Sequence, residues 1–233
     1  MSVSPTSHPS GYHWTMPATG QREIIVINNT NMDWRSRIAN RAALWSQAQD
    51  LNLTVTDGSQ DPTLRQDCPF PAAYRQIRVC SYPYNAPWAG LARVKLESNS
   101  AVHIQSGWVK LDNEDLSFGA GLQRHVICQE VGHDLGLAHW RQPGNLSCMN
   151  DRPEGQDYEE PVQHDLNQID NQTHYHGGFL GNMDFGDPLN GDAFICNSAT
   201  CIDSAVTHRM LPNGQTIVTF KLRIAHGHRG YYR

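Results

Sequence analysis

The sequence lacks long hydrophobic runs, has few lysines and carries little net charge. No stretch of about 18 apolar residues is present, so no segment is expected to cross a membrane. Only three of the 18 basic residues are lysines, and the formal net charge is −5 at pH 7. Because this mild charge implies neither a basic stripe nor a basic patch, we expect no nucleic-acid partner and no membrane partner. There is no internal repeat and no low-complexity tract.

The first residues do not have the pattern of a secretory leader. Met1–Pro5 has neither the basic patch nor the apolar core of a signal peptide. If the protein is exported, we expect a leader or pro-segment to have been removed before this sequence begins.

Cysteine usage indicates an oxidising compartment. The six cysteines fall into pairs that are close in sequence, and a preference for short loops predicts Cys68–Cys80, Cys128–Cys148 and Cys196–Cys201. Six cysteines also allow other pairings, and six buried thiols in a cytosolic protein are the alternative. The pattern favours a secreted, extracellular protein.

The chain of 233 residues, 39% of them hydrophobic, is long enough for one large domain or two unequal subdomains. β-Branched and alternating segments predict strands over residues 23–28, 53–56, 76–80, 91–96 and 101–111. Helical spacing of apolar residues predicts helices over 33–50 (capped by Asp33), 122–137 and 161–175. Near the end, segments 206–210 and 216–224 flank Pro212-Asn213-Gly214, which predicts a hairpin. This order of elements predicts an α+β fold with a twisted mixed sheet.

The segment from Gln129 to His139 has the pattern of a metal site. Positions 129 and 133 lie one helical turn apart, about 6 Å along the axis, and Glu130 projects beside them. Gly136 can end the helix with a positive φ, after which a sharp turn can return His139 to the same point. Gln129, His133 and His139 therefore predict a tripod for one metal ion. Glu130 is placed to take a proton from a water on that ion.

This segment resembles the extended zinc motif of the metzincin peptidases, with its glutamate, its turn-forming glycine and its histidine ligands. Met149, in Ser147-Cys148-Met149, resembles the methionine turn beneath the metal in that family. The likeness extends to the matrixin branch in Gly11-Tyr12-His13-Trp14, in Trp88–Ala92 and in His164-Asp165. It covers residues 11–176.

The resemblance implies a metzincin-like fold with an active-site helix, a cleft and a C-terminal subdomain that carries the methionine turn. It divides the chain into an N-terminal arm (1–15), a catalytic domain (16–176) and a C-terminal extension (177–233), packed on the domain or continuous with it. A protein or peptide substrate is expected to lie extended in the cleft, paired with an edge strand near residues 101–105. The chain is expected to be a monomer.

The implied function is that of a secreted zinc endopeptidase. One catalytic zinc ion would be held by Gln129, His133 and His139, and would lower the pKa of its water and polarise the scissile carbonyl. Glu130 would act as the general base, and Met149 would form an apolar floor below the metal.

The chain departs from the motif at the first ligand position, where Gln129 stands in place of a histidine. Cys128-Gln129-Glu130 is similar to a group of metzincin-like proteins that carry cysteine-glutamine-glutamate there. Three interpretations are open: Gln129 binds the metal through its amide oxygen, it holds only a water, or the site is empty. His125 is not expected to replace the ligand, because about 12 Å of helix separates it from His133. A catalytically weak or silent peptide-binding module is therefore the alternative function.

Other polar clusters suggest less. Asp112-Asn113-Glu114-Asp115 could hold calcium through oxygen ligands, although a polar turn is the simpler interpretation. The histidines of the pairs 174/176 and 226/228 are interpreted as solvated polar residues.

Overall fold

The computed structural model describes residues 12–98, 100, 102–114, 119–140, 146–150, 159–171 and 207–222. In chain order the elements are β1 (His13–Trp14), β2 (Arg22–Asn29), α1 (Met32–Trp45), β3 (Leu51–Asp57), α2 (Pro62–Asp67), β4 (Gln76–Tyr82), β5 (Gly90–Leu96), β6 (His103–Asp112), α3 (Ala120–Asp134), α4 (Gln163–Asn171), β7 (Thr207–Met210) and β8 (Thr216–Leu222). Each strand and helix predicted from the sequence has a counterpart here, with ends that differ by a few residues. Residues 172–175 of the third predicted helix lie outside the described ranges, as do residues 206 and 223–224 of the predicted hairpin.

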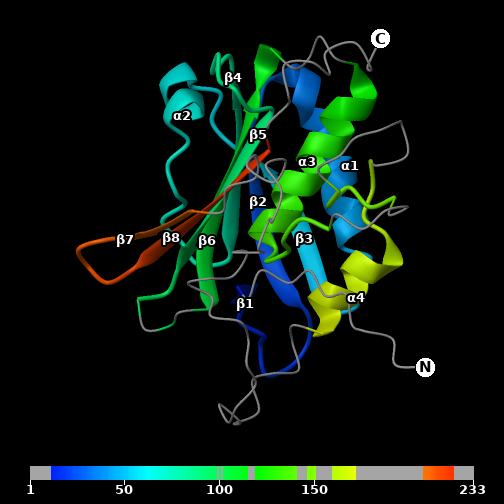
Figure 1. The fold of residues 1–233 in the computed structure, drawn as a ribbon, viewed down its shortest axis with the longest axis vertical. Coiled ribbons are helices and arrows are strands. Elements are labelled where there is room, and N and C mark those ends of the chain that lie inside the picture. Colours follow the sequence, from blue (N-terminus) through cyan, green and yellow to red (C-terminus); the bar gives the residue numbers. More distant parts are fainter. Residues whose placement is uncertain are drawn as a thin grey trace, which may run out of the picture.

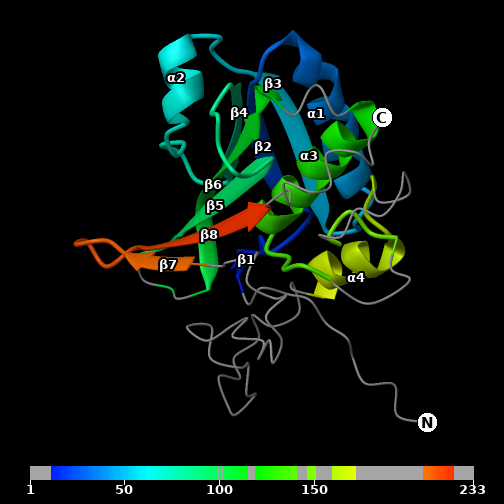
Figure 2. The same cartoon turned by 45° about the horizontal axis from the view of Figure 1, so that its top comes forward.

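The strands form one mixed sheet in the order β3-β2-β4-β6-β5-β8-β7, and β1 pairs with the start of β6 (Figure 1). The pairs β2–β3, β2–β4 and β4–β6 are parallel, whereas β5 is antiparallel to both β6 and β8. Helices α1 and α3 lie side by side against the sheet (Figures 1 and 2). The mixed α+β architecture predicted from the sequence is confirmed.

The core lies between the sheet and the pair α1 and α3. Helix α1 buries Trp34, Ile38, Ala42 and Trp45, the four apolar positions whose spacing predicts the helix. The predicted cap is wrong by two residues: the helix begins at Met32 with Asn31 as the N-cap, and Asp33 lies in its first turn. An acidic side chain in that turn still favours the helix, because it faces the positive end of the helix dipole.

Helix α2 was not predicted, although its start has a recognisable pattern. Asp61 accepts a hydrogen bond from the backbone N–H of Leu64 at 2.9 Å, and Pro62 occupies the first turn. The helix ends after one and a half turns because Cys68 takes a left-handed conformation, with φ 44°. It is too short to show a helical period in the sequence.

The strand expected at the open edge of the sheet is an interior strand, which is a correction. β6 lies between β4 and β5, and β1 covers its first residues through the pairs His13–His103 and Trp14–Ile104. The edges of the path are β3 on one side and the hairpin β7–β8 on the other. An extended peptide therefore cannot pair with residues 103–105 as the sequence suggested, and residue 101 lies outside the described ranges.

Both ends of the described chain join this sheet. Tyr12 and Trp14 are buried, and the indole Nε1 of Trp14 donates to the backbone oxygen of Asp134 at 2.7 Å. Residues 12–14, which the sequence assigned to an N-terminal arm, thus contribute to the core. The hairpin β7–β8 forms as predicted around Gly214, whose φ is 79°, and it continues the sheet.

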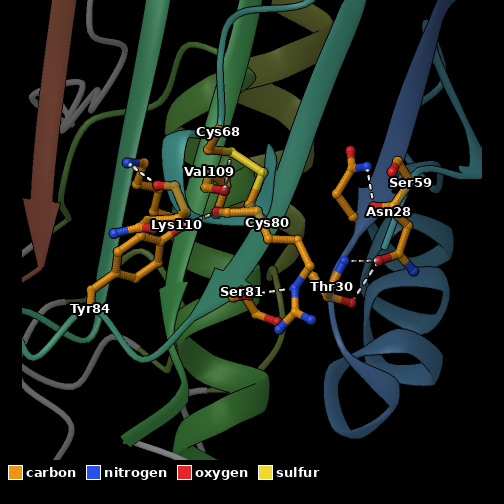
Figure 3. The surroundings of a disulfide bond; sticks show 12 residues. Asn28, Thr30, Ser59, Cys68, Cys80, Ser81, Tyr84, Val109 and Lys110 are labelled. Atoms are coloured by element: carbon orange, nitrogen blue, oxygen red, sulfur yellow. Dashed lines mark hydrogen bonds between the residues drawn. A yellow bond between two sulfur atoms is a disulfide. The ribbon is translucent and has the colours of Figure 1, made fainter. Parts of the chain in front are cut away.

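The sheet face opposite α1 and α3 carries a smaller core built on the predicted Cys68–Cys80 disulfide (Figure 3). Leu91 and Trp108 pack against this bond. The three lysines of the chain stand on the same face: Lys95 on β5, Lys110 on β6 and Lys221 on β8. The ammonium of Lys110 lies 4.9 Å from the ring centre of Tyr84 (Figure 3). The chain thus concentrates all of its lysines on one face of one sheet.

Candidate functional site

Helix α3 places the motif residues in the interior of the molecule. Gln129, Glu130 and His133 are fully buried between α1, the sheet and the loops that follow the helix. The helix ends at Asp134, and Gly136 takes the positive φ of 92° that the sequence predicted. The backbone N–H of Leu137 then returns to the carbonyl of Gly132 at 3.0 Å.

This turn brings the two histidines of the motif together. Nε2 of His133 lies 3.1 Å from Nε2 of His139, and the rings meet edge to face with centroids 4.5 Å apart. Nδ1 of His133 lies 2.8 Å from the carbonyl oxygen of Leu137, to which it can only donate. That bond fixes the tautomer and leaves the lone pair of Nε2 directed at His139. Two imidazole nitrogens so placed share either a proton or a cation.

The spacing of these nitrogens fits zinc. Two zinc–nitrogen bonds of about 2.0–2.1 Å at a tetrahedral angle hold their nitrogens about 3.3 Å apart, close to the observed 3.1 Å. Within the described ranges, no three histidine, cysteine, aspartate or glutamate side chains converge as a metal site. A metal ion held by these two histidines would therefore need a ligand of another kind, such as an amide oxygen.

Gln129 can supply such a ligand. It lies one helical turn before His133, and neither its Oε1 nor its Nε2 has a hydrogen-bond partner in the described part of the chain. Each buried donor or acceptor left without a hydrogen bond costs about 1–3 kcal/mol. Native structures therefore rarely leave a buried amide without a hydrogen-bond partner or another ligand. Its unused oxygen, one helical turn before His133, is available for the first of the three interpretations of Gln129.

Glu130 lies beside this group, between α3 and β5. A Cβ added at Gly90 would be only 2.5 Å from its Oε1, so the glycine makes room for the carboxyl group. Neither carboxyl oxygen has a partner of normal hydrogen-bond geometry among the described residues. Burial raises the pKa of Glu130 well above its ordinary value, and the backbone of Ala92 offsets part of that rise. A raised pKa suits a group that must accept and then release a proton.

A second buried carboxyl group, that of Asp134, was missed by the sequence reasoning. It follows Glu130 by one helical turn and packs against Gly107 of β6, where a Cβ would meet its Oδ2 at 2.5 Å. Burial, and secondarily the charge of Glu130, raise the pKa of Asp134 well above its ordinary value. The signal was present in the sequence, because acidic residues four apart on one helix share a face.

The turn that holds Met149 packs against α3. Gly132 touches Met149 and Trp45 so closely that a Cβ there would overlap the methionine sulfur. The turn is tied down by Ser147, which donates from Oγ to Oδ2 of Asp165 at 2.6 Å and accepts from the N–H of Met149 at 2.8 Å. His164, next to Asp165, stacks on Trp140 with ring centres 4.0 Å apart.

The predicted bond between Cys128 and Cys148 is confirmed, and it joins α3 to the turn that holds Met149. Both cysteines are completely buried. The structure thus confirms two of the three predicted disulfides. The third, Cys196–Cys201, lies outside the described residues and stays a prediction.

Strand β8 covers the other side of the histidine pair, which the sequence did not predict. The ring of Phe220 stacks on that of His133, with centroids 4.6 Å apart and planes 6° apart. Phe220 stands opposite Ala92 in the pairing of β8 with β5. Figure 2 shows the end of β8 beside α3.

The remaining polar candidates have other roles in the fold. His125 is buried in α3, one helical turn before Gln129. The carboxylate of Asp112 accepts from the backbone N–H groups of Tyr84 and Ala86 at 3.2 and 3.1 Å, so it organises a turn. No observation supports calcium there, and Asp115 lies outside the described residues. The histidine pairs 174/176 and 226/228 also lie outside them.

None of the helices in the described ranges has the length and apolar character needed to span a membrane.

Comparison with known proteins gives little beyond this geometry. No family model matches the chain, and no curated protein matches it. Among solved structures, it is similar to high choriolytic enzyme 1, a hatching enzyme zinc-protease from the medaka fish Oryzias latipes. That alignment has 14% sequence identity and a TM-score of 0.32, and it covers 60% of this chain and 54% of the other.

Proposed function

We propose that this protein is a secreted zinc-dependent endopeptidase. Gln129, His133 and His139 hold the metal, and Glu130 is the general base. The observation that carries the proposal is the pair of convergent imidazole nitrogens, 3.1 Å apart, with the His133 tautomer fixed by Leu137. The oxidised cysteine pairs fit a protein that acts outside the cell.

Each residue near the pair has a separate task. A zinc ion bound there supplies a Lewis acid that makes water more acidic and polarises a peptide carbonyl. Oε1 of Glu130 accepts the proton of the attacking water and passes it to the leaving amine. Met149 keeps the site apolar on the side where it packs against Gly132. The Cys128–Cys148 bond fixes the position of the turn that holds Met149 relative to α3.

A silent peptide-binding module is the second candidate, and two observations favour it. Gln129 gives a weaker zinc ligand than histidine. In addition, Phe220 covers one face of the His133 ring. Glu130 favours the peptidase, because a binding module gains nothing from a fully buried carboxyl group.

Metal analysis and casein digestion test the proposal together. We expect the purified full chain to retain a single zinc ion, and casein cleavage to stop with a chelator and return with added zinc. His139→Ala should lose both the metal and the cleavage. His103→Ala removes a half-buried histidine from β6, outside the site, and serves as the matched control. Zinc content that is equally low in all three proteins, with no cleavage by any of them, would leave the binding module as the better assignment.

A further inference from the structure

Strand β8 lies where an extended peptide would have to lie to reach the candidate catalytic residues. It runs antiparallel to β5 over the pairs from Gly90–Leu222 to Lys95–Ile217. Glu130 packs against Gly90, and His133 packs against Phe220. The stretch from 220 to 222 thus passes directly beside both residues. β8 is part of the same chain, but its backbone makes the contacts that a bound peptide strand makes.

The side chains of β8 fill the inner face in the alternating pattern of a bound strand. Val218 and Phe220 point toward α3 and are buried, whereas Thr219 stands opposite Arg93 on the outer face. At its other end, the hairpin turn is joined to β6 by a hydrogen bond from Nε2 of Gln215 to Oε1 of Gln105, at 2.6 Å. The hairpin is anchored mainly by ladder bonds and two inward apolar side chains.

We propose that β8 is an intramolecular ligand that occupies the edge of β5 from Gly90 to Lys95 and blocks peptide binding there. The inference rests on the proposed function, because it identifies what covers the substrate-binding edge of that same site. The ligand class follows from β8 itself: an extended, antiparallel segment with an aliphatic residue and, two positions later, an aromatic residue facing His133. A substrate must displace β8 before its carbonyl can reach the histidine pair.

Because β8 is covalently tethered to the site, it outcompetes free peptides for the edge of β5. A strand joined to the same chain acts at an effective concentration of about millimolar. A free peptide therefore competes poorly while the contacts of β8 with β5 and His133 are intact. Weakening the contacts of β8 raises the fraction of molecules in which the edge of β5 is unoccupied. The apparent affinity for free peptide then rises in proportion to that fraction.

The test is fluorescence polarisation with a labelled heptapeptide, Thr-Ile-Val-Thr-Phe-Lys-Leu, which copies residues 216–222. Binding is measured on full-length, chelator-treated protein. We expect Phe220→Ala to bind this peptide at least about tenfold more tightly than the wild-type chain does. Met210→Ala changes an exposed residue of the same hairpin and should bind like wild type. A peptide whose phenylalanine is replaced by alanine should bind markedly less well to Phe220→Ala.

A hairpin locked covalently onto β5 gives an independent test, which remains available if Phe220→Ala fails to fold. Arg93 and Thr219 are directly opposite each other on the outer face, where cross-strand Cβ atoms are about 4.5–5.5 Å apart. Arg93→Cys combined with Thr219→Cys should form a disulfide that holds β8 on β5 and abolishes peptide binding. Each single cysteine variant is the matched control. Equal peptide affinity for the locked and single variants would refute the inference.

The two proposals fail in different ways. Peptide binding that follows this pattern, with no zinc-dependent cleavage by any variant, would overturn the peptidase and leave the binding edge. Zinc-dependent cleavage at the same rate in the locked and unlocked proteins would overturn the binding edge and leave the peptidase.

Discussion

Glu130→Gln is expected to lower kcat/KM for casein-derived peptides by about 10²–10⁴-fold, the usual contribution of a general base. Zinc content and the far-ultraviolet circular dichroism spectrum should stay near those of the wild type. The amide has the same shape as the carboxyl group, so it fits the space beside Gly90 but cannot accept the proton. Glu130→Ala should show the same loss of activity. Activity within a few-fold of wild type in both variants would rule out the assigned base.

Asp134→Asn is the matched control for that experiment. Asp134 is on the same helix, one turn later, and it is just as deeply buried. Its carboxyl group faces Gly107 of β6, whereas that of Glu130 faces Gly90 of β5. We therefore expect Asp134→Asn to keep most of the activity. If it removes activity as completely as Glu130→Gln does, burial of charge in α3 and not base catalysis explains both effects.

Gln129→His should raise zinc affinity by at least about tenfold, because imidazole suits zinc better than a neutral amide oxygen and even indirect changes around a metal alter affinity by 10–100-fold. The new imidazole would occupy a position one turn before His133, in the space that the unpartnered amide now fills. Competition with a zinc-binding dye at fixed pH measures the affinity, and the pH must be fixed because protons compete with the metal for histidine.

Gln129→Ala separates the interpretations that the sequence left open. If the amide oxygen is a ligand, alanine lowers zinc affinity below that of the wild-type chain. Unchanged affinity would mean that only water fills that corner. Should wild type, Gln129→His and Gln129→Ala all fail to hold zinc, the metal-dependent peptidase is wrong.

The parts of the site that are local in sequence were predictable. Gln129, Glu130 and His133 share one helix, and the turn at Gly136 brings His139 back to His133 within a few residues. The Cys128–Cys148 bond followed from the same closeness along the chain. Spacing on one helix and in one turn has few physical solutions, which is why the pattern was informative.

The parts that depend on distant pairing were not predictable. Phe220 stacks on His133 only because β8 pairs with the side of β5 that faces away from β6. The sequence of β8 predicts a strand and a hairpin but gives no information about which edge it will join. For the same reason residues 101–105 were assigned to an edge, although β6 lies inside the sheet.

The placement of the lysines makes the motion of the hairpin measurable with one enzyme. A protease that cuts only after lysine has three target sites, Lys95, Lys110 and Lys221, and all of them lie within paired strands. Such bonds are cut only when the strand leaves its ladder. Cutting after Lys221 requires only that β8 separate from β5, whereas cutting after the other two requires the middle of the sheet to open. The rate of cleavage after Lys221, relative to cleavage after the other two lysines, therefore measures how often β8 separates from β5.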